Sequence, residues 1–136
     1  MKKIVLFLIV ITSFLSCSLD DDGPTYTYEV LPVDSYVVPA SFTLGQTYEI
    51  KLKYQKPTSC HIYQGVYYEK NLNTRTIAIQ TAVQNNQVCT TEIPPISEVS
   101  FNFMVSNTGS YIFKFYKGED AGGKDVFEEV EIPVVP

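Results

Sequence analysis

The chain has 136 residues and a formal net charge of −5, with 15 acidic side chains against 10 basic ones. A chain this acidic is a poor partner for nucleic acid, whose phosphates attract clustered lysine and arginine. It has no tryptophan and one histidine, but ten tyrosines and eight phenylalanines. Together with its many valine, isoleucine and threonine residues, this composition is typical of β-strands.

The first segment of the chain is basic and then apolar. Lys2 and Lys3 precede the apolar run of residues 4–11, and a short stretch then leads to Cys17. The run is shorter than the roughly 20 residues that a spanning helix needs. Residues 1–16 are therefore predicted to be a secretory signal peptide. Its removal leaves a more acidic chain, of a size that forms one domain with a real core.

Phe14, Leu15 and Ser16 stand directly before Cys17, and this arrangement resembles a bacterial lipobox. The resemblance implies cleavage before Cys17 and diacylation of its thiol, so that the chain is held on a membrane. Two or more acyl chains anchor a protein stably, since each buried methylene contributes about 0.8 kcal/mol. Leucine is more usual where Phe14 stands, although looser lipoboxes occur in the Bacteroidetes. The alternative is an ordinary signal peptide with an incidental cysteine.

A serine and three aspartates follow this cysteine: Ser18, Asp20, Asp21 and Asp22. The cluster resembles the export signal of Bacteroidetes surface lipoproteins. That resemblance implies an outer-membrane lipoprotein that faces the cell exterior. The alternative is a plain solvated tether, because runs of like charge are usually disordered. In both interpretations residues 17–25 are a tether and residues 26–136 form the folded domain.

Apolar and polar residues alternate along this domain, with turn residues between the runs. The clearest alternation is in Thr47–Tyr54, and Gly65 is a candidate bulge in a later run. The predicted strands, in chain order, are residues 26–33, 36–38, 47–54, 60–68, 75–83, 99–105, 110–116 and 126–134, the last two joined by a turn over residues 117–125. No segment has a helical period. The sequence therefore predicts an all-β antiparallel sandwich of about seven to eight strands.

Two cysteines, Cys60 and Cys89, lie within the predicted domain. An exported chain meets an oxidising compartment, so we expect these two cysteines to form a disulfide. The alternative is two free, buried thiols. A zinc site is disfavoured. Cys60, His61 and Cys89 would give three ligands, but Cys60 and His61 are adjacent and the sequence has no C-x-x-C pair.

Three tyrosines, Tyr63, Tyr67 and Tyr68, gather in one predicted strand. Exposed tyrosines can stack on sugar rings or anchor protein interfaces, because each brings apolar area and a hydroxyl group. Tyr63 and Tyr67 share a face of a regular strand unless Gly65 bulges, and Tyr68 then points the other way. The alternative is that the three rings pack in the core or cover its edge.

The segment from Asn107 to Tyr111 reads Asn-Thr-Gly-Ser-Tyr and resembles the Asp-x-Gly-x-Tyr segment of immunoglobulin-like folds. The resemblance implies an immunoglobulin-like sandwich in which the Tyr111 hydroxyl binds the backbone, as a structural tyrosine corner. Asn107 replaces the usual aspartate, and Phe113 stands where an antibody domain has its second cysteine. The resemblance concerns the fold and carries no activity.

Catalytic and metal-binding signals are weak, and we expect neither an enzyme nor a cofactor. His61 is the single histidine, and no G-x-S-x-G segment is present. Acidic residues between positions 119 and 131 could form a carboxylate pair or part of a calcium shell. Their alternation with apolar residues, and the glycines among them, favour a solvated turn and strand face instead.

The sequence leads to three functional hypotheses. The first is a non-catalytic binding or adhesion module on the cell surface, with a glycan or a protein as its partner. The second is a protective lipoprotein, such as an inhibitor or immunity protein against a secreted effector. The third, an enzyme, has the weakest support because no catalytic constellation is visible.

Overall fold

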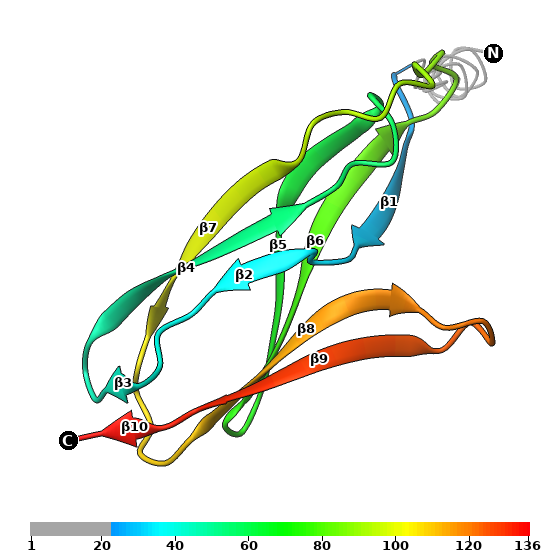
Figure 1. The fold of residues 1–136 in the computed structure, drawn as a ribbon. Coiled ribbons are helices and arrows are strands. Elements are labelled where there is room, and N and C mark those ends of the chain that lie inside the picture. The colour runs from blue at the N-terminus through cyan, green and yellow to red at the C-terminus, as the bar shows by residue number, and fades with distance from the viewer. Residues whose placement is uncertain (1–22) are drawn as a thin grey trace, which may run out of the picture.

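The computed structural model describes residues 23–136, and these residues fold into an all-β structure (Figure 1). Ten strands are formed in the described part: β1 (Tyr26–Leu31), β2 (Ser35–Val37), β3 (Phe42–Thr43), β4 (Thr47–Tyr54), β5 (His61–Asn71), β6 (Thr74–Gln84), β7 (Ser97–Met104), β8 (Tyr111–Glu119), β9 (Asp125–Ile132) and β10 (Val134–Val135). The predicted signal peptide, the proposed lipidation site Cys17 and the acidic cluster lie outside the described residues.

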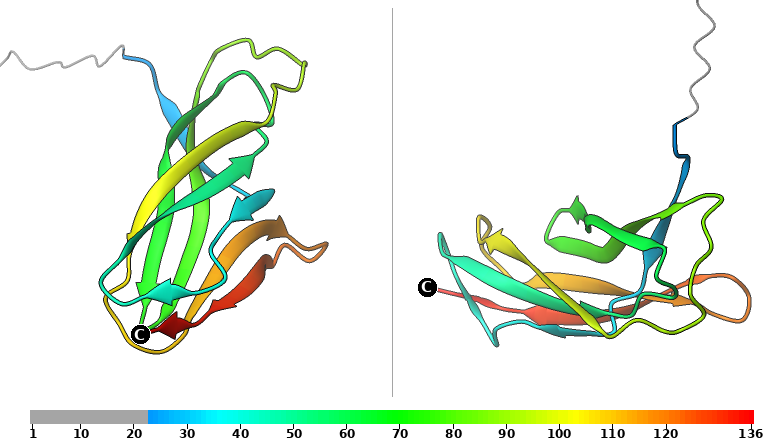
Figure 2. Two further views of the ribbon diagram at one scale, coloured as in Figure 1. Left: turned by 60° about the vertical axis from the view of Figure 1, so that its left-hand side comes forward. Right: turned by 90° about the horizontal axis from the view of Figure 1, so that it is seen from above.

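The strands form two main sheets and one short pair (Figure 2). The first sheet contains β1, β5, β6, β8 and β9, and the second contains β2, β4 and β7, while β3 pairs with β10. β6 is the centre of the first sheet, since β5 pairs along nearly its whole length. β8 pairs with residues 74–77 of β6, and β1 pairs with residues 79–84.

The alternation of residues predicted most strands, and β4 has the bounds expected from the sequence. The expectation of a purely antiparallel sandwich is wrong, because β6 and β8 run parallel and so do β3 and β10. The physical reason lies in the chain path. After β6 the chain crosses to the second sheet, where β7 pairs with β4, and β8 then returns beside β6 in the same direction as β6. Two-residue strands such as β3 have too few positions to show alternation.

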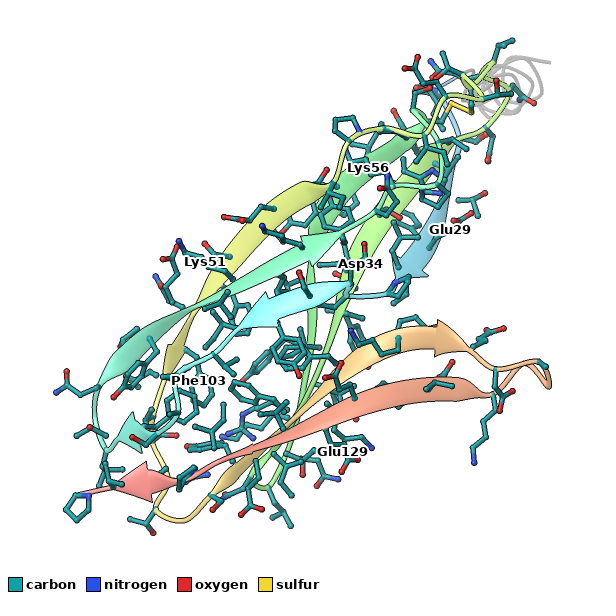
Figure 3. All side chains as sticks on the ribbon, in the orientation of Figure 1. Glu29, Asp34, Lys51, Lys56, Phe103 and Glu129 are labelled. Carbon is teal, nitrogen blue, oxygen red and sulfur yellow. A yellow bond between two sulfur atoms is a disulfide. The ribbon has the colours of Figure 1, made fainter. Side chains whose placement is uncertain are left out.

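Apolar side chains from both sheets meet in one core. The second sheet contributes Ile50, Leu52 and Tyr54 from β4, and all three are buried. The first sheet contributes buried residues of β6 and β8: Ile77, Ile79, Tyr111, Phe113 and Phe115. Phe103 of β7 lies among these rings between the sheets (Figure 3), with its centroid 5.0 Å from that of Tyr111. The two sheets are therefore held face to face by burial of apolar area.

Tyr111 is fully buried, yet its hydroxyl has partners. The oxygen accepts hydrogen bonds from the backbone N–H groups of Asn107, at 2.9 Å, and Ser106, at 3.2 Å. These are the backbone contacts that the sequence resemblance implies. Burial alone would raise the pKa of Tyr111, but hydrogen bonds from Asn107 and Ser106 favour the charged form more, and the pKa is lowered.

The disulfide between Cys60 and Cys89 is confirmed, and the alternative of two free thiols is wrong. The two Cα atoms lie 5.4 Å apart across a sequence separation of 29 residues. The bond joins the start of β5 to the loop of residues 85–96 that follows β6. A crosslink that closes a loop of this size stabilises the fold by about 3–4 kcal/mol on the chain-entropy account.

We predict that Tyr111→Phe destabilises the domain by about 1–3 kcal/mol, because two backbone N–H groups lose their acceptor while the ring still fills its place. Urea unfolding of the full chain, followed by far-ultraviolet circular dichroism, measures the change. Tyr28→Phe is the matched control, since Tyr28 is 75% exposed. Equal unfolding midpoints for the two variants would show that the Tyr111 hydroxyl does not stabilise the fold.

Candidate functional site

The three tyrosines of β5 do not form one surface. The register of β5 against β6 shifts between Tyr63 and Gly65, so the strand has a bulge there. Tyr63 and Tyr68 consequently pair with Thr81 and Ile77, whose side chains are both buried. Tyr67 pairs with Ala78 and lies on the opposite face of the sheet.

Tyr63 and Tyr68 pack between the sheets at the edge of the core. The Tyr63 ring lies 6.2 Å from that of Tyr54, and the Tyr68 ring lies 5.9 Å from that of Phe101. Partial burial raises the pKa of both hydroxyl groups. Both rings nevertheless remain 37% and 43% exposed, and Tyr68 lines a hollow of about 340 Å³ between β5 and β7. Tyr67 lines a larger hollow on the opposite face of the sheet.

That hollow is a groove of about 510 Å³ on the outer face of the first sheet, and we call it the outer-face groove. It is lined by residues of five strands: Val30, Tyr67, Glu69, Thr76, Ala78, Tyr116, Glu119, Asp125 and Phe127. Thr76 and Ala78 form part of its floor and alternate with the core residue Ile77. β8 and β1 lie beside different stretches of β6 (Figure 1), because β6 changes its partner between Ile77 and Ile79. Residues of all three strands line the groove.

Aromatic rings line two sides of the groove. Tyr116 of β8 and Phe127 of β9 are direct cross-strand partners, with ring centroids 5.7 Å apart and planes tilted by 53°. Tyr67 faces them from β5. Lys114 lies beside this wall, since its ammonium nitrogen is 4.9 Å from the centroid of Phe127 and 3.4 Å from a carboxylate oxygen of Glu129.

Three carboxylates, Glu69, Glu119 and Asp125, complete the lining, and no lysine or arginine is among the lining residues. None of the three has an ion-pair partner within residues 23–136, whereas each of five other glutamates does: Glu29, Glu49, Glu98, Glu128 and Glu129. Glu119 and Asp125 are also opposite each other in the β8–β9 register. The outer-face groove therefore has a negative electrostatic potential.

These carboxylates help to raise the pKa values of the two tyrosines that line the groove. The Tyr67 hydroxyl donates a 3.0 Å hydrogen bond to Glu69, and this bond, together with the charge of Glu69, raises the pKa of Tyr67. Partial burial and the charges of Asp125 and Glu119 raise the pKa of Tyr116. Both hydroxyl groups are accordingly neutral donors at physiological pH.

A tight turn fixes the acidic end of the groove. Asp120 accepts hydrogen bonds through its side chain from the N–H groups of Gly122 and Lys124, at 2.8 and 3.0 Å. Its carboxylate thus stabilises the turn that the sequence predicts between β8 and β9. Glu128 points elsewhere, toward Tyr36 and Lys117. Within the described chain, no three His, Cys, Asp or Glu side chains gather closely enough to surround a metal ion.

His61 belongs to a separate hydrogen-bonded group that the sequence did not reveal. Its ring nitrogens lie 2.9 Å from the Thr58 hydroxyl and 3.0 Å from the Glu29 carboxylate. This order resembles a nucleophile, base and acid relay. The Thr58 oxygen, however, also accepts a hydrogen bond from the N–H of Cys60. His61 is buried, with only 7% of its surface exposed. The group fastens the turn before β5 to β1, which is a structural role.

Sequence reasoning singled out Tyr67 of the groove as a candidate binding residue. It also considered Glu119 and Asp125, but favoured a solvated turn and strand face for them, and it missed the rings across from Tyr67. The usable signal was an aromatic residue on the solvent side of an alternating strand. Tyr116 lies between the core residue Phe115 and Lys117, and Phe127 lies between Val126 and Glu128. Several large rings grouped on the polar face of a sheet indicate an interaction surface.

Comparison with known proteins gives no relative: no family model matches the chain, and neither curated proteins nor solved structures match it significantly. Among residues 23–136, no helix has the length and apolar character needed to cross a membrane.

We predict that Glu69→Gln lowers the pKa of Tyr67 toward its ordinary value, because the neutral amide removes the charged acceptor that favours the protonated phenol. NMR titration of the tyrosine ring carbons in the full chain measures the change. Glu131→Gln, an equal loss of charge on the same sheet outside the groove, should leave the Tyr67 pKa unchanged. A Tyr67 pKa that is the same in Glu69→Gln and in the unmodified chain would contradict the hydrogen bond.

Proposed function

We propose that this chain is an outer-membrane, surface-exposed lipoprotein of the Bacteroidetes type, whose β domain is a non-catalytic binding or adhesion module. The observation that carries the proposal is the outer-face groove, in which aromatic rings and unpaired carboxylates converge. Such a concave surface with a few polar groups is the usual form of a ligand site. Residues 17–25 would connect the module to the membrane, and β1 begins directly after them at Tyr26.

We further propose that the domain is immunoglobulin-like. Support comes from the two face-to-face sheets and from the Tyr111 hydroxyl, which binds the backbone of the segment before its own strand. The parallel pairing of β6 with β8 is a departure from an all-antiparallel sandwich of this type. A rigid scaffold of this kind holds a shallow site on one sheet without a moving part.

The geometry of the rings favours a protein partner over a glycan. A sugar ring stacks on a flat, exposed aromatic face, and a chain of sugars needs coplanar rings. Tyr116 and Phe127 are tilted by 53° and face Tyr67 across a groove. A protruding side chain fits between such walls better than a flat sugar does. A glycan partner is the alternative within the same proposal.

A protective inhibitor is the second candidate, and one feature favours it. The loop of residues 85–96 projects from the end of the domain opposite the C-terminus (Figure 2) and is fastened by the disulfide. Val88 in this loop is 100% exposed and Ile93 is 69% exposed. However, Asn85 binds the backbone of Thr25 at the start of β1, so the loop lies at the tether end. The outer-face groove is better placed to meet a partner away from the membrane.

The anchor has its own test. We predict that Cys17→Ala releases the protein from the membrane or leaves the precursor uncleaved, because the thiol that would carry the acyl chains is gone. Membrane fractionation and intact-mass measurement of the full chain give the result. Ser18→Ala is the control and should leave the protein on the membrane. Normal membrane retention of Cys17→Ala would refute lipidation.

Binding through the groove can be tested by photo-crosslinking on intact cells. We predict that Phe127→p-benzoylphenylalanine in the full chain forms covalent adducts, because the probe replaces a ring of the groove wall with a larger ring of similar shape. The control is Val37→p-benzoylphenylalanine on β2, where the side chain is also exposed. Mass spectrometry identifies the captured molecule.

Two outcomes would contradict the proposed site. Equal adducts at both positions would show non-specific contact. No adduct at position 127, together with capture of a secreted hydrolase by the same probe placed at Ile93, would favour the inhibitor instead.

A further inference from the structure

We propose that the outer-face groove binds the side chain of a lysine or arginine on a protein partner. The inference rests on the proposed binding function and names the chemistry of its ligand. The occupant is a cationic side chain with an apolar stem, presented by a segment of the partner. An amino sugar would carry the same ammonium group, and the experiment below separates these two sources.

Charge complementarity is the first argument. Glu69 approaches from one side of the groove, and Glu119 and Asp125 from the end of the β8–β9 hairpin. None of these carboxylates is neutralised within the described chain. Three other acidic residues on the same sheet, Glu29, Glu128 and Glu129, have partners, and Glu129, for example, binds Lys114 at 3.4 Å; Glu131 has none. A bound ammonium or guanidinium group would supply the missing partner and form charge-assisted hydrogen bonds.

The aromatic walls are the second argument. A cation is attracted to the face of an aromatic ring within about 6 Å of its centroid. The chain itself provides an example, since the Lys114 ammonium nitrogen lies 4.9 Å from the centroid of Phe127. Tyr67 and Tyr116 offer two further rings beside the unpaired carboxylates. Acids and rings together favour a cation more specifically than either would alone.

The floor of the groove is the third argument. Val30, Ala78 and the methyl group of Thr76 provide apolar surface between the charged and aromatic walls. Lysine and arginine bury their methylene stems along such surfaces while the charged end stays near solvent or a counter-ion. The volume of about 510 Å³ holds one long side chain and part of its backbone.

The test compares two double variants with equal loss of charge. Glu119→Gln with Asp125→Asn removes two groove charges and keeps the size of each side chain. The control, Glu92→Gln with Glu131→Gln, removes two exposed charges outside the groove. The probes are the peptides acetyl-Gly-Lys-Gly-amide, acetyl-Gly-Arg-Gly-amide and acetyl-Gly-Gln-Gly-amide. NMR shifts of the Thr76 and Ala78 backbone amides in the full chain report binding.

We expect the lysine and arginine peptides to shift these amides and the glutamine peptide to bind at least about tenfold more weakly, because it lacks the charge for both interactions. The groove variant should lose about tenfold in affinity for the cationic peptides, and the control variant should lose much less. Binding should also weaken with added salt, since the pairs are partly exposed.

Three results would overturn the inference. The glutamine peptide could bind as well as the lysine peptide, or the groove variant could bind the cationic peptides as well as the control variant. Thirdly, glucosamine oligomers could bind more tightly than the lysine peptide, which would assign the ammonium group to a glycan. N-acetylated oligomers of the same length serve as the neutral sugar control.

Failure of this inference is distinguishable from failure of the proposed function. If Phe127→p-benzoylphenylalanine still captures a partner specifically while the groove charges prove irrelevant, the module binds through neutral contacts and only the cation is wrong. If no partner is captured at that position, the binding function at this surface is wrong as well.

Discussion

The buried side chain of Tyr111 is the contact on which the rest of the domain depends. Its ring packs against Phe42, Phe103 and the guanidinium group of Arg75, which lies 4.9 Å from the ring centroid. Its hydroxyl holds the segment between β7 and β8. Arg75 is itself buried, and it donates hydrogen bonds to the carbonyl groups of Leu72 and Thr74. One phenol thus joins both sheets and the turn between β5 and β6.

This junction determines which strands become neighbours. Asn73, in the turn before β6, donates to the carbonyl of Ser110, and the N–H of Ile112 donates to the carbonyl of Asn73. The starts of β6 and β8 are therefore fixed side by side, and the two strands leave that point in the same direction. Their pairing ends at Ile77, where β1 takes over from Ile79. The outer-face groove follows from this change of partner.

The sequence predicted what depends on local alternation and little of what depends on tertiary pairing. Core positions on β4 and the disulfide follow from residue type and spacing, and the backbone contact of Tyr111 was implied by the resemblance of residues 107–111 to the segment of immunoglobulin-like folds. The parallel β6–β8 pair could not be predicted in this way, because the residue pattern of a strand does not show whether its neighbour runs parallel or antiparallel. Tyr67 was a candidate from the outset, but its separation from Tyr63 depended on the bulge at Gly65. The groove joins residues of five strands, which only the fold assembles.

In the β8–β9 hairpin, two acidic residues stand where they do not stabilise the fold. Along the same two strands, Lys114 stands opposite Glu129 and the pair forms a salt bridge. Farther toward the turn, Glu119 stands opposite Asp125, and like charges in that position oppose pairing. The turn is held by the Asp120 side chain and by backbone hydrogen bonds between Asp120, Gly123 and Lys124, none of which uses the side chain of Glu119 or Asp125. A lysine at either position would therefore replace a repulsion by an attraction. A cationic ligand would remove this repulsion, and its binding would then stabilise the folded domain by linkage.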